Sequence, residues 1–474
     1  MEEVVSSKKN IKNILIVLIG NIFSILSSIL IGFFIPKMME VEAYGYYKTF
    51  ALYFEYAVLL SVGFSDGIYL LFAGTAYKDL DVPLFRMFSK ILMISQGIIA
   101  VLCCGISVFF ITTNYGFIFF FVGLSIFFSN MLNYFQYMSR LTEQYKQLTV
   151  RDMLKAILNI ASVVTLFVLF KTGGFTTLNF KIYVAIYVGI LALITIVYAF
   201  NYRQILFGRS EKVKDELAIL KKVFHLGIPL LIANFVNSFI LIIDKQFVNV
   251  LYDVEVYGIY AFAYSMMGFI TTAISAISTV LFPVLKRFSK DRLKDKYINL
   301  LSAVAIVVAV CLSGYFPIKW ICEHYLQNYA GSLLYFRIIL PGLMISSLIT
   351  LVMFNYYKSM ESIVEFFIKS FVVLVIAFLL DLGAHLIFKS PVAISIASII
   401  TFVIWYVVIE FKFYRLWKLS YWKNALYLLS IGASFYVITI FIENVYISFG
   451  VWMGAMIALT LLFHFNLIKN KFRI

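Results

Sequence analysis

About fourteen long apolar stretches follow one another along this chain, and short polar segments separate them. Stretches of about 18 to 25 apolar residues are long enough to cross the hydrocarbon core of a bilayer. Because backbone N–H and C=O groups in lipid must be hydrogen-bonded within the segment, each stretch is expected to form a helix. The predicted fold class is therefore an all-α polytopic membrane protein with about 14 transmembrane helices. Their expected limits are 12–35, 45–73, 86–112, 115–138, 153–171, 180–200, 226–250, 257–283, 298–321, 332–356, 363–388, 391–411, 424–443 and 446–468.

Composition and charge agree with a membrane location. Of the 474 residues, 63% are hydrophobic and 13% are charged, which excludes an ordinary soluble protein. The first stretch is long enough to remain as a span, and it lacks the small-residue cleavage site of a signal peptide. The net charge of +15 raises the question of a nucleic-acid partner. With the N-terminus inside, however, 31 of the 39 basic residues fall in cytoplasmic segments, five in outer loops and three in spans. This distribution predicts a multi-pass membrane protein with both termini cytoplasmic, and no nucleic-acid partner.

The sequence lacks the motifs that would carry enzymatic chemistry. The four cysteines form no CxxC pair, so neither a disulfide framework nor a metal site is expected. There is no Walker loop, nucleophile elbow, HExxH or GxGxxG pattern. We therefore expect no catalytic residue, no metal and no cofactor, and the chain is not expected to hydrolyse ATP itself.

Two short motifs indicate an internal duplication. Residues 41–47 (VEAYGYY) and 254–260 (VEVYGIY) agree at five of seven positions, 213 residues apart, and Asn21 and Asn234 have the same separation. Coincidence in a tyrosine-rich chain is the alternative, and the second pair in register argues against it. Six spans separate the motifs, so the two copies should have the same orientation and be related by an axis along the membrane normal.

The duplication and the loop lengths predict four segments. Residues 1–203 would form an N-terminal six-helix lobe and residues 226–415 a second six-helix lobe, with two additional transmembrane helices in 416–474. Between the lobes, residues 204–225 carry apolar side chains at helical spacing among lysines. This pattern predicts an amphipathic helix on the cytoplasmic membrane surface.

Three ionisable residues lie in the second predicted span. Lys48, Glu55 and Asp66 are separated by seven and eleven positions, so on a continuous helix they would share one stripe. Intramembrane charges usually face a cavity or a partner, although Lys48 and Asp66 could instead snorkel at opposite ends.

Other predicted spans of the two repeats also carry polar residues. Small and hydroxyl residues on such faces are also typical of tight helix packing. Their occurrence in the first two helices of both repeats favours a shared central cavity. The residues concerned are Asn21 in the first span, Asn234, Asn237, Asp244 and Lys245 within an arc of about 120° in the seventh, and Tyr264 in the eighth.

The sequence allows two interpretations each for the charged residues of the tenth and eleventh predicted spans. Arg337 in the tenth span could pair with an acid or contact an anion. Asp381 and His385, four residues apart in the eleventh span, are interpreted as a solvated helix end, with a proton relay as the alternative.

Several of these residues occur in motifs that resemble a known family. The chain is similar to the polysaccharide-exporter, or O-antigen flippase, branch of the multidrug/oligosaccharidyl-lipid/polysaccharide exporter superfamily, over essentially its whole length. The GFSDGIYL stretch is the most specific match. The motifs are FIPK at 34–37 followed by YGYY at 44–47, GFSDGIYL at 63–70, GIPL at 227–230, IDK at 243–245, and GIY at 258–260 with Tyr264.

The resemblance implies a flippase for a polyprenyl-pyrophosphate-linked oligosaccharide, working by alternating access and coupled to a gradient of H⁺ or Na⁺. The lipid-linked sugar and the bilayer would be its partners, with the polysaccharide polymerase machinery as a further candidate. Lipid II flippases carry an arginine cluster in the central cavity, and the few intramembrane cations here argue against that particular cargo. The resemblance assigns Lys48, Lys245 and Arg337 to the anionic head group, Glu55, Asp66 and Asp244 to the coupling ion or proton, and Asn21, Asn234, Asn237 and Tyr264 to the polar cavity lining.

Two alternatives remain from the sequence. A cation-coupled multidrug exporter of the same superfamily would share these features. A membrane polysaccharide polymerase or ligase would need a sizeable external loop with catalytic residues, and the predicted loops are short.

Overall fold

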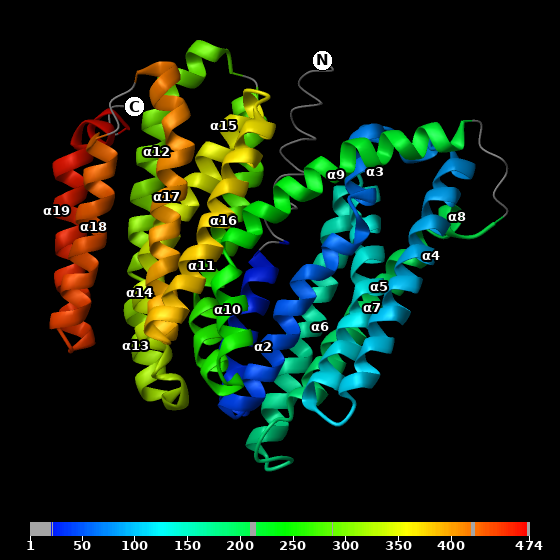
Figure 1. The fold of residues 1–474 in the computed structure, drawn as a ribbon, viewed down its shortest axis with the longest axis horizontal. Helices are drawn as coiled ribbons and strands as arrows, with labels where there is room; N and C mark the ends of the chain where they lie inside the picture. The colour runs from blue at the N-terminus through cyan, green and yellow to red at the C-terminus, as the bar shows by residue number, and fades with distance from the viewer. Residues whose placement is uncertain (1–19, 21, 209–214, 287, 419–421, 472–474) are drawn as a thin grey trace. The chain divides into compact units, whose positions relative to one another are not determined.

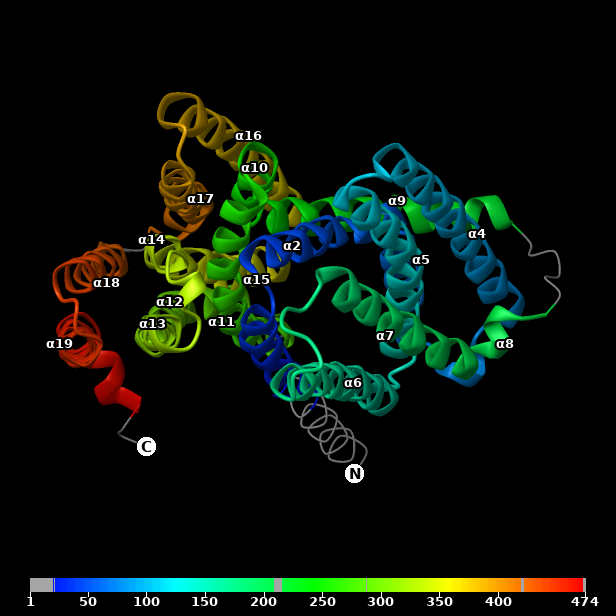
Figure 2. The same ribbon diagram turned by 90° about the horizontal axis from the view of Figure 1, so that it is seen from below.

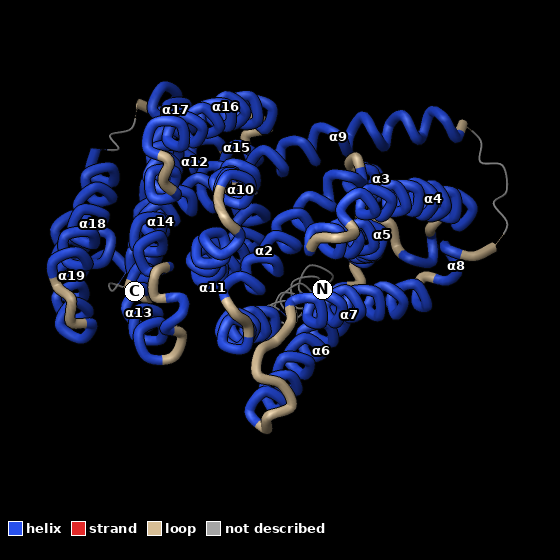
Figure 3. Tube along the Cα trace, turned by 60° about the horizontal axis from the view of Figure 1, so that its bottom comes forward, coloured by secondary structure: helices blue, strands red, loops and turns tan. Residues whose placement is uncertain are grey.

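The computed structural model describes residues 20, 22–208, 215–286, 288–418 and 422–471. All regular structure in these ranges is helical, and short loops join the helices (Figure 3). Eleven helices in the described ranges are long and apolar enough to cross a membrane, and twelve when one bent pair counts as a single span. The two remaining predicted spans correspond to the shorter helix Ile22–Met38 and to the 33-residue helix α11. The predicted all-α membrane fold is confirmed.

The chain forms two compact units, Met1–Phe235 and Val236–Ile474. The elements of the first unit, coloured from blue to green in Figure 1, are helix Ile22–Met38, α2 (Val41–Glu55), η1 (Tyr56–Ser61), α3 (Phe64–Phe72), η2 (Tyr77–Asp79), α4 (Val82–Ser107), η3 (Val108–Phe110), α5 (Asn114–Leu141), α6 (Tyr145–Lys171), α7 (Phe180–Asn201), α8 (Arg203–Leu206) and most of α9 (Glu216–Ile240). Those of the second are α10 (Ile243–Leu251), α11 (Val254–Lys286), α12 (Lys290–Leu312), α13 (Tyr315–His324), η4 (Gln327–Tyr329), α14 (Ser332–Ser347), the π-helical stretch η5 (Leu348–Met353), α15 (Phe354–Ser359), α16 (Ile363–Phe388), α17 (Pro391–Trp417), α18 (Trp422–Phe441) and α19 (Val445–Lys471).

Aromatic side chains fill the core of the first unit, where α5 packs between α4 and α7 (Figure 2). The ring of Phe135 stacks on Tyr198 and on Tyr202, with centroids 6.1 and 5.7 Å apart. The hydroxyl of Tyr202 lies 2.8 Å from Ser139 Oγ, and that of Tyr134 lies 3.0 Å from Ser89 Oγ. Hydroxyls buried away from water need such partners, so this core is apolar in its bulk and hydrogen-bonded at its few polar atoms.

The second predicted span is broken rather than continuous. After α2, the chain passes through η1 and then through Val62 and Gly63, whose φ angles of 52° and 71° lie in the left-handed region. Left-handed residues end a right-handed helix, and the axes on either side differ by 52°. The expectation that Lys48, Glu55 and Asp66 share one stripe is therefore wrong, because Asp66 lies on α3, a separate helix beyond the bend.

Two buried side chains stabilise this break. Asn130 of α5 donates through Nδ2 to the carbonyl of Ala57 at 2.9 Å, and to Gln96 Oε1 at 2.7 Å. Gln96 of α4 donates through Nε2 to the carbonyl of Leu60 at 2.9 Å. Both side chains are at most 2% exposed. Because a backbone carbonyl freed by a broken helix is costly in lipid, these amides replace the missing helical donors and make the bend a fixed feature.

The seventh predicted span is broken as well. Helix α9 ends at Ile240 and α10 begins at Ile243, after Ile242 with φ −130° and ψ −3°. The arc calculated for one helix through Asn234, Asn237 and Asp244 is therefore also wrong, because Asp244 and Lys245 belong to α10.

The expected surface helix in the linker does not end where the sequence predicts. Helix α9 runs through the expected boundary at 225/226 without interruption, so no separate helix ends there. Residues 209–214 of the expected linker lie outside the described residues.

Candidate functional site

Asp66 in the first unit is a buried acid held by one tyrosine. It lies in the first turn of α3 and is 4% exposed. Its Oδ1 accepts a hydrogen bond of 2.7 Å from the hydroxyl of Tyr137 in α5. The ring of Tyr137 packs against Tyr69, with centroids 5.4 Å apart, and the guanidinium of Arg140 lies 5.5 Å from the Tyr137 ring centre. Asp66 is thus part of a compact polar group near one end of the bent span.

The glycines in the motifs around Asp66 allow two backbones to approach closely. A Cβ on Gly67 would lie 2.0 Å from the carbonyl oxygen of Val223, and a Cβ on Gly227 would lie 1.9 Å from the carbonyl oxygen of Gly63. Both Val223 and Gly227 lie on α9, which passes beside α3 in Figure 1. The GFSDG and GIP motifs therefore place two backbones in contact, and they carry Asp66 at that crossing.

Asp244 in the second unit is the centre of a larger network. It lies in the first turn of α10 and is 2% exposed. Its Oδ2 accepts hydrogen bonds from the hydroxyls of Tyr260 at 2.7 Å, of Ser398 at 2.9 Å and of Tyr264. Its Oδ1 accepts from the backbone N–H of Lys245 at 2.7 Å. Helices α10, α11 and α17 thus each supply groups to one buried carboxylate.

A second carboxylate belongs to the same part of the unit. Asp381 of α16 is 1% exposed, and among the described residues neither of its oxygens has a hydrogen-bond partner. Helix α16 packs against α10, which carries Asp244, and against α17, which carries Ser398. Four residues further on, His385 Nδ1 lies 3.0 Å from the hydroxyl of Tyr252. The interpretation of Asp381 as a solvated helix end is therefore wrong, because the side chain is enclosed by packed helices.

The chemistry of this pair is that of a cation or proton site. Two carboxylates taken out of water repel each other unless a proton or a cation lies between them. Hydroxyls from Tyr260, Tyr264 and Ser398 surround Asp244, and hard cations prefer such oxygen ligands. The described residues contain no group of three or more His, Cys, Asp or Glu side chains that could hold a metal ion. The arrangement fits a proton or a monovalent cation better than a zinc-type site.

The three basic residues expected at the head group lie on three different helices. Lys48 of α2 is half-buried, with its ammonium 5.2 Å and 5.1 Å from the ring centres of Tyr44 and Tyr47. Lys245 of α10 has its ammonium 5.4 Å from the ring centre of Tyr264. Lys245 is therefore beside the Asp244 network.

Arg337 of α14 makes a contact within its own unit. It donates through Nη1 to the carbonyl of Thr439 in α18 at 3.3 Å.

The remaining predicted residues differ in exposure. Glu55 ends α2 and is exposed, and Asn234 on α9 is exposed. Asn237 is 8% exposed, and its Oδ1 has no hydrogen-bond partner among the described residues. Tyr264 donates to Asp244. Asn21 lies outside the described residues.

Sequence reasoning missed several members of the Asp244 network. Tyr260 occurs in the repeated motif, and this repetition is the signal in the sequence that points to it. Asp381 is an intramembrane charge in the sequence, where its position predicts a solvated helix end. Ser398 lies in the same span as Ser395 and Thr401, and nothing in the sequence distinguishes it from them. No periodicity in the sequence indicates that α17 packs against α10.

Comparisons with known proteins agree with this architecture. Residues 82–316 match the family model described as polysaccharide biosynthesis protein. The fold is similar to that of the lipid II flippase MurJ in an inward closed conformation, with a TM-score of 0.68 and 15% identity over 97% of this chain and 100% of that one. No curated protein matches the chain in sequence.

Two further solved structures have the same fold. An inward-facing multidrug resistance MATE transporter of the MOP superfamily gives a TM-score of 0.57 at 13% identity, over 85% of this chain and 96% of that one. A MOP superfamily transporter from Pyrococcus furiosus gives 0.54 at 12% identity, over 86% and 97%. Residues 82–316 are thus similar to the polysaccharide biosynthesis family, and the chain is a multi-pass membrane protein whose fold is that of solved flippases and exporters.

Proposed function

We propose that this protein is a flippase that moves a polyprenyl-pyrophosphate-linked oligosaccharide from the cytoplasmic to the outer leaflet of a bacterial plasma membrane. The cargo needs such a protein, because each unpaired hydroxyl entering hydrocarbon costs about 2–7 kcal/mol and the diphosphate is ionic. The observation that carries the cargo class is the match of residues 82–316 to the polysaccharide biosynthesis family, on a chain that also has the fold of a lipid II flippase.

The transport is proposed to follow alternating access, with both termini cytoplasmic. Lys48, Lys245 and Arg337 are assigned to the anionic head group, and the amides of Asn21, Asn234 and Asn237 to the sugar. These assignments rest on the sequence motifs. For Lys245 they are supported further by its position beside a buried carboxylate network.

Coupling to an H⁺ or Na⁺ gradient is proposed to use the carboxylates of Asp244 and Asp381. Two enclosed acids, one with no donor for either oxygen among the described residues, are stable only when they bind a proton or a cation. Binding of that ion would change the charge inside the second unit and so bias its conformation. Glu55 and Asp66 in the first unit are secondary candidates for the same role.

A cation-coupled multidrug exporter is the second candidate, because MATE transporters share the fold. A deletion strain separates the two. A flippase predicts that lipid-linked oligosaccharide accumulates on the cytoplasmic side while drug sensitivity stays unchanged. Increased sensitivity to cationic drugs with normal surface polysaccharide would instead support the exporter.

A further inference from the structure

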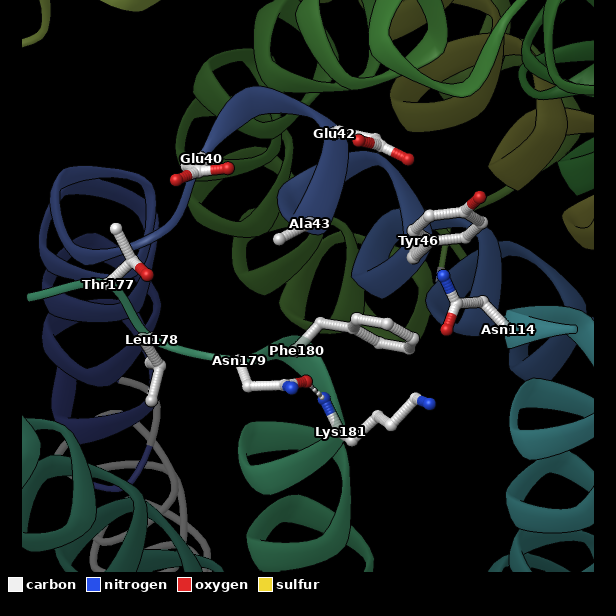
Figure 4. A pocket seen from close by; sticks show the side chains of 10 residues that line it. All are labelled: Glu40, Glu42, Ala43, Tyr46, Asn114, Thr177, Leu178, Asn179, Phe180 and Lys181. Carbon is white, nitrogen blue, oxygen red and sulfur yellow. Dashed lines mark hydrogen bonds between the residues drawn. The ribbon is translucent and has the colours of Figure 1, made fainter. Parts of the chain in front are cut away.

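A pocket on the first unit has a composition that the proposed transport mechanism does not use. It has a volume of about 410 Å³ and is lined by residues of α2, α5, α7 and the segment before α7 (Figure 4). Pockets of about 300–1,000 Å³ are typical of small-molecule sites, so this one has room for more than an ion. The three helices all begin here, at Val41, Asn114 and Phe180. The expected topology places those three helix starts on the outer side of the membrane.

The polar groups of the pocket include both acceptors and donors. Glu40 and Glu42 supply carboxylates, Lys181 supplies an ammonium, and Asn114 supplies an amide that does both. Glu40 and Glu42 are exposed at the start of α2. Two carboxylates disfavour an anionic ligand, and a lysine disfavours a bare cation. A neutral polyol, whose hydroxyls donate and accept, satisfies the whole set.

Aromatic rings complete the pocket. Tyr46 stacks on Phe180, with centroids 5.2 Å apart, and meets Tyr115 edge-on at 5.9 Å. Figure 4 shows the Phe180 ring between Tyr46 and Lys181, with Asn114 beside Tyr46. Tyrosine combines an apolar face with a polar tip, and a pyranose ring has an apolar C–H face and a polar rim that match it.

Hydrogen bonds fix the backbone on the side of the pocket formed by the start of α7. Asn179 caps α7 by accepting from the N–H of Lys181 at 2.9 Å, which fixes the start of that helix. The N–H of Leu178 donates to the carbonyl of Met38 at 2.7 Å, which ties the segment before α7 to the chain just ahead of α2. The backbone on this side of the pocket is therefore hydrogen-bonded without a ligand, which lowers the entropic cost of binding.

The internal repeat supplies a comparison. Glu42 corresponds to Glu255 in the second motif, but Tyr46 corresponds to Ile259. In the second unit Ile259 packs near Gly331, where a Cβ would lie 3.6 Å from its Cγ2. The acid is thus common to both copies, whereas the aromatic platform belongs to the first copy alone.

We propose that this pocket, formed by Glu40, Glu42, Tyr46, Asn114, Phe180 and Lys181, binds the sugar portion of a glycan on the outer side of the membrane. The choice of a sugar ligand is consistent with the proposed function, while the geometry of the pocket is independent of it. A site at this position would hold delivered oligosaccharide after it leaves the transport path.

Saturation-transfer NMR on the full-length protein in nanodiscs tests the proposal. The probes are free disaccharides: maltose and chitobiose, which are uncharged, and cellobiuronic acid, whose carboxylate the pocket glutamates should repel. We expect saturation transfer to maltose or chitobiose and less to cellobiuronic acid. Binding should be weakened about tenfold or more in Glu42→Gln and Tyr46→Ile, because each removes a polar or stacking contact. Glu255→Gln, the matched change in the second motif, should bind as the wild type does.

Either of two results would contradict the proposal that this pocket binds a sugar. One is that neither maltose nor chitobiose receives saturation from the wild type. The other is that Glu42→Gln, which changes an exposed carboxylate and leaves the fold intact, binds like Glu255→Gln. The assay involves no translocation, so a protein that moves lipid-linked sugar but binds no disaccharide refutes this pocket alone. One that binds but does not translocate refutes the proposed function alone.

Discussion

At the scale of single residues, the second unit contains two buried carboxylates that differ in their hydrogen bonding. Asp244 accepts bonds from three side-chain hydroxyls and one backbone N–H. Asp381 is equally buried but has no donor for either oxygen within the described ranges. A fully satisfied acid beside an unsatisfied one is what a site for an exchangeable proton or cation requires, because the bound ion satisfies the second acid.

Neutralising either carboxylate should abolish coupling without preventing insertion. We expect Asp244→Asn and Asp381→Asn to reduce gradient-driven transport about 5- to 150-fold, the usual range for a lost coupling energy. Transport in proteoliposomes with and without an imposed ion gradient measures it. Asp253→Asn, an exposed acid just before α11, is the control. Gradient dependence equal to wild type in both Asn variants would remove the acids from the mechanism.

Asp66 and Glu55 should behave independently of each other. Asp66 accepts a hydrogen bond from Tyr137, and the two acids lie on separate helices. In a double-mutant cycle, Asp66→Asn and Tyr137→Phe should therefore be non-additive by about 0.5–3 kcal/mol, measured as thermal unfolding in detergent. Glu55→Gln with Tyr137→Phe should be additive.

The double variant Glu55→Gln/Asp66→Asn should still insert into the membrane but export poorly. Normal surface polysaccharide in that strain would exclude both acids from the transport mechanism.

At the scale of elements, broken helices position the polar groups. The sequence predicts spans well, because length and hydropathy determine whether a segment crosses lipid. It does not predict the breaks at Val62–Gly63 and at Ile242, because both lie inside apolar stretches and Val and Ile ordinarily continue a helix. The amides that stabilise the first break come from α4 and α5, and only tertiary packing brings them there. Asp66 and Asp244 are therefore buried acids whose neighbours differ from those that a continuous helix predicts, and their role in coupling stays a prediction.

The glycine crossing between α3 and α9 should be sensitive to one added methyl group. Gly67→Ala places a Cβ against the Val223 carbonyl, and such overpacking costs about 1–3 kcal/mol. Gly97→Ala in α4 has open space around its Cβ and should be neutral or stabilising, since alanine favours helix. Thermal unfolding of both variants tests this, and equal melting temperatures would contradict the close approach.

Removing the amide that stabilises the first break should destabilise the unit. Asn130→Leu leaves the Ala57 carbonyl and the Gln96 side chain without their donor, a loss of about 1–3 kcal/mol. Ser125→Ala, on the same helix, removes only a bond to its own helix at the Phe121 carbonyl and should change little. A Ser125→Ala variant as unstable as Asn130→Leu would show that the break does not depend on the amide.

At the scale of the whole molecule, the chain consists of two compact units that differ in chemistry. The first contains the glycine crossing, the bent span and the outer pocket. The second contains the paired acids. The duplicated motif gives both units a tyrosine-rich helix start, yet the second replaces Tyr46 by Ile259. We propose that this division places ion coupling in the second copy and contact with released sugar in the first.

Movement of a labelled lipid-linked oligosaccharide between leaflets tests the central claim most directly. The protein is reconstituted in liposomes that carry the fluorescent lipid in one leaflet, and a sugar-modifying reagent confined to the opposite side reports arrival. The account predicts protein-dependent arrival without change in the mass of the lipid. An H⁺ or Na⁺ gradient should accelerate this arrival in the wild type, and Asp244→Asn should lose that acceleration. Arrival no faster than in protein-free liposomes, or a changed lipid mass that reveals an enzyme, would contradict it.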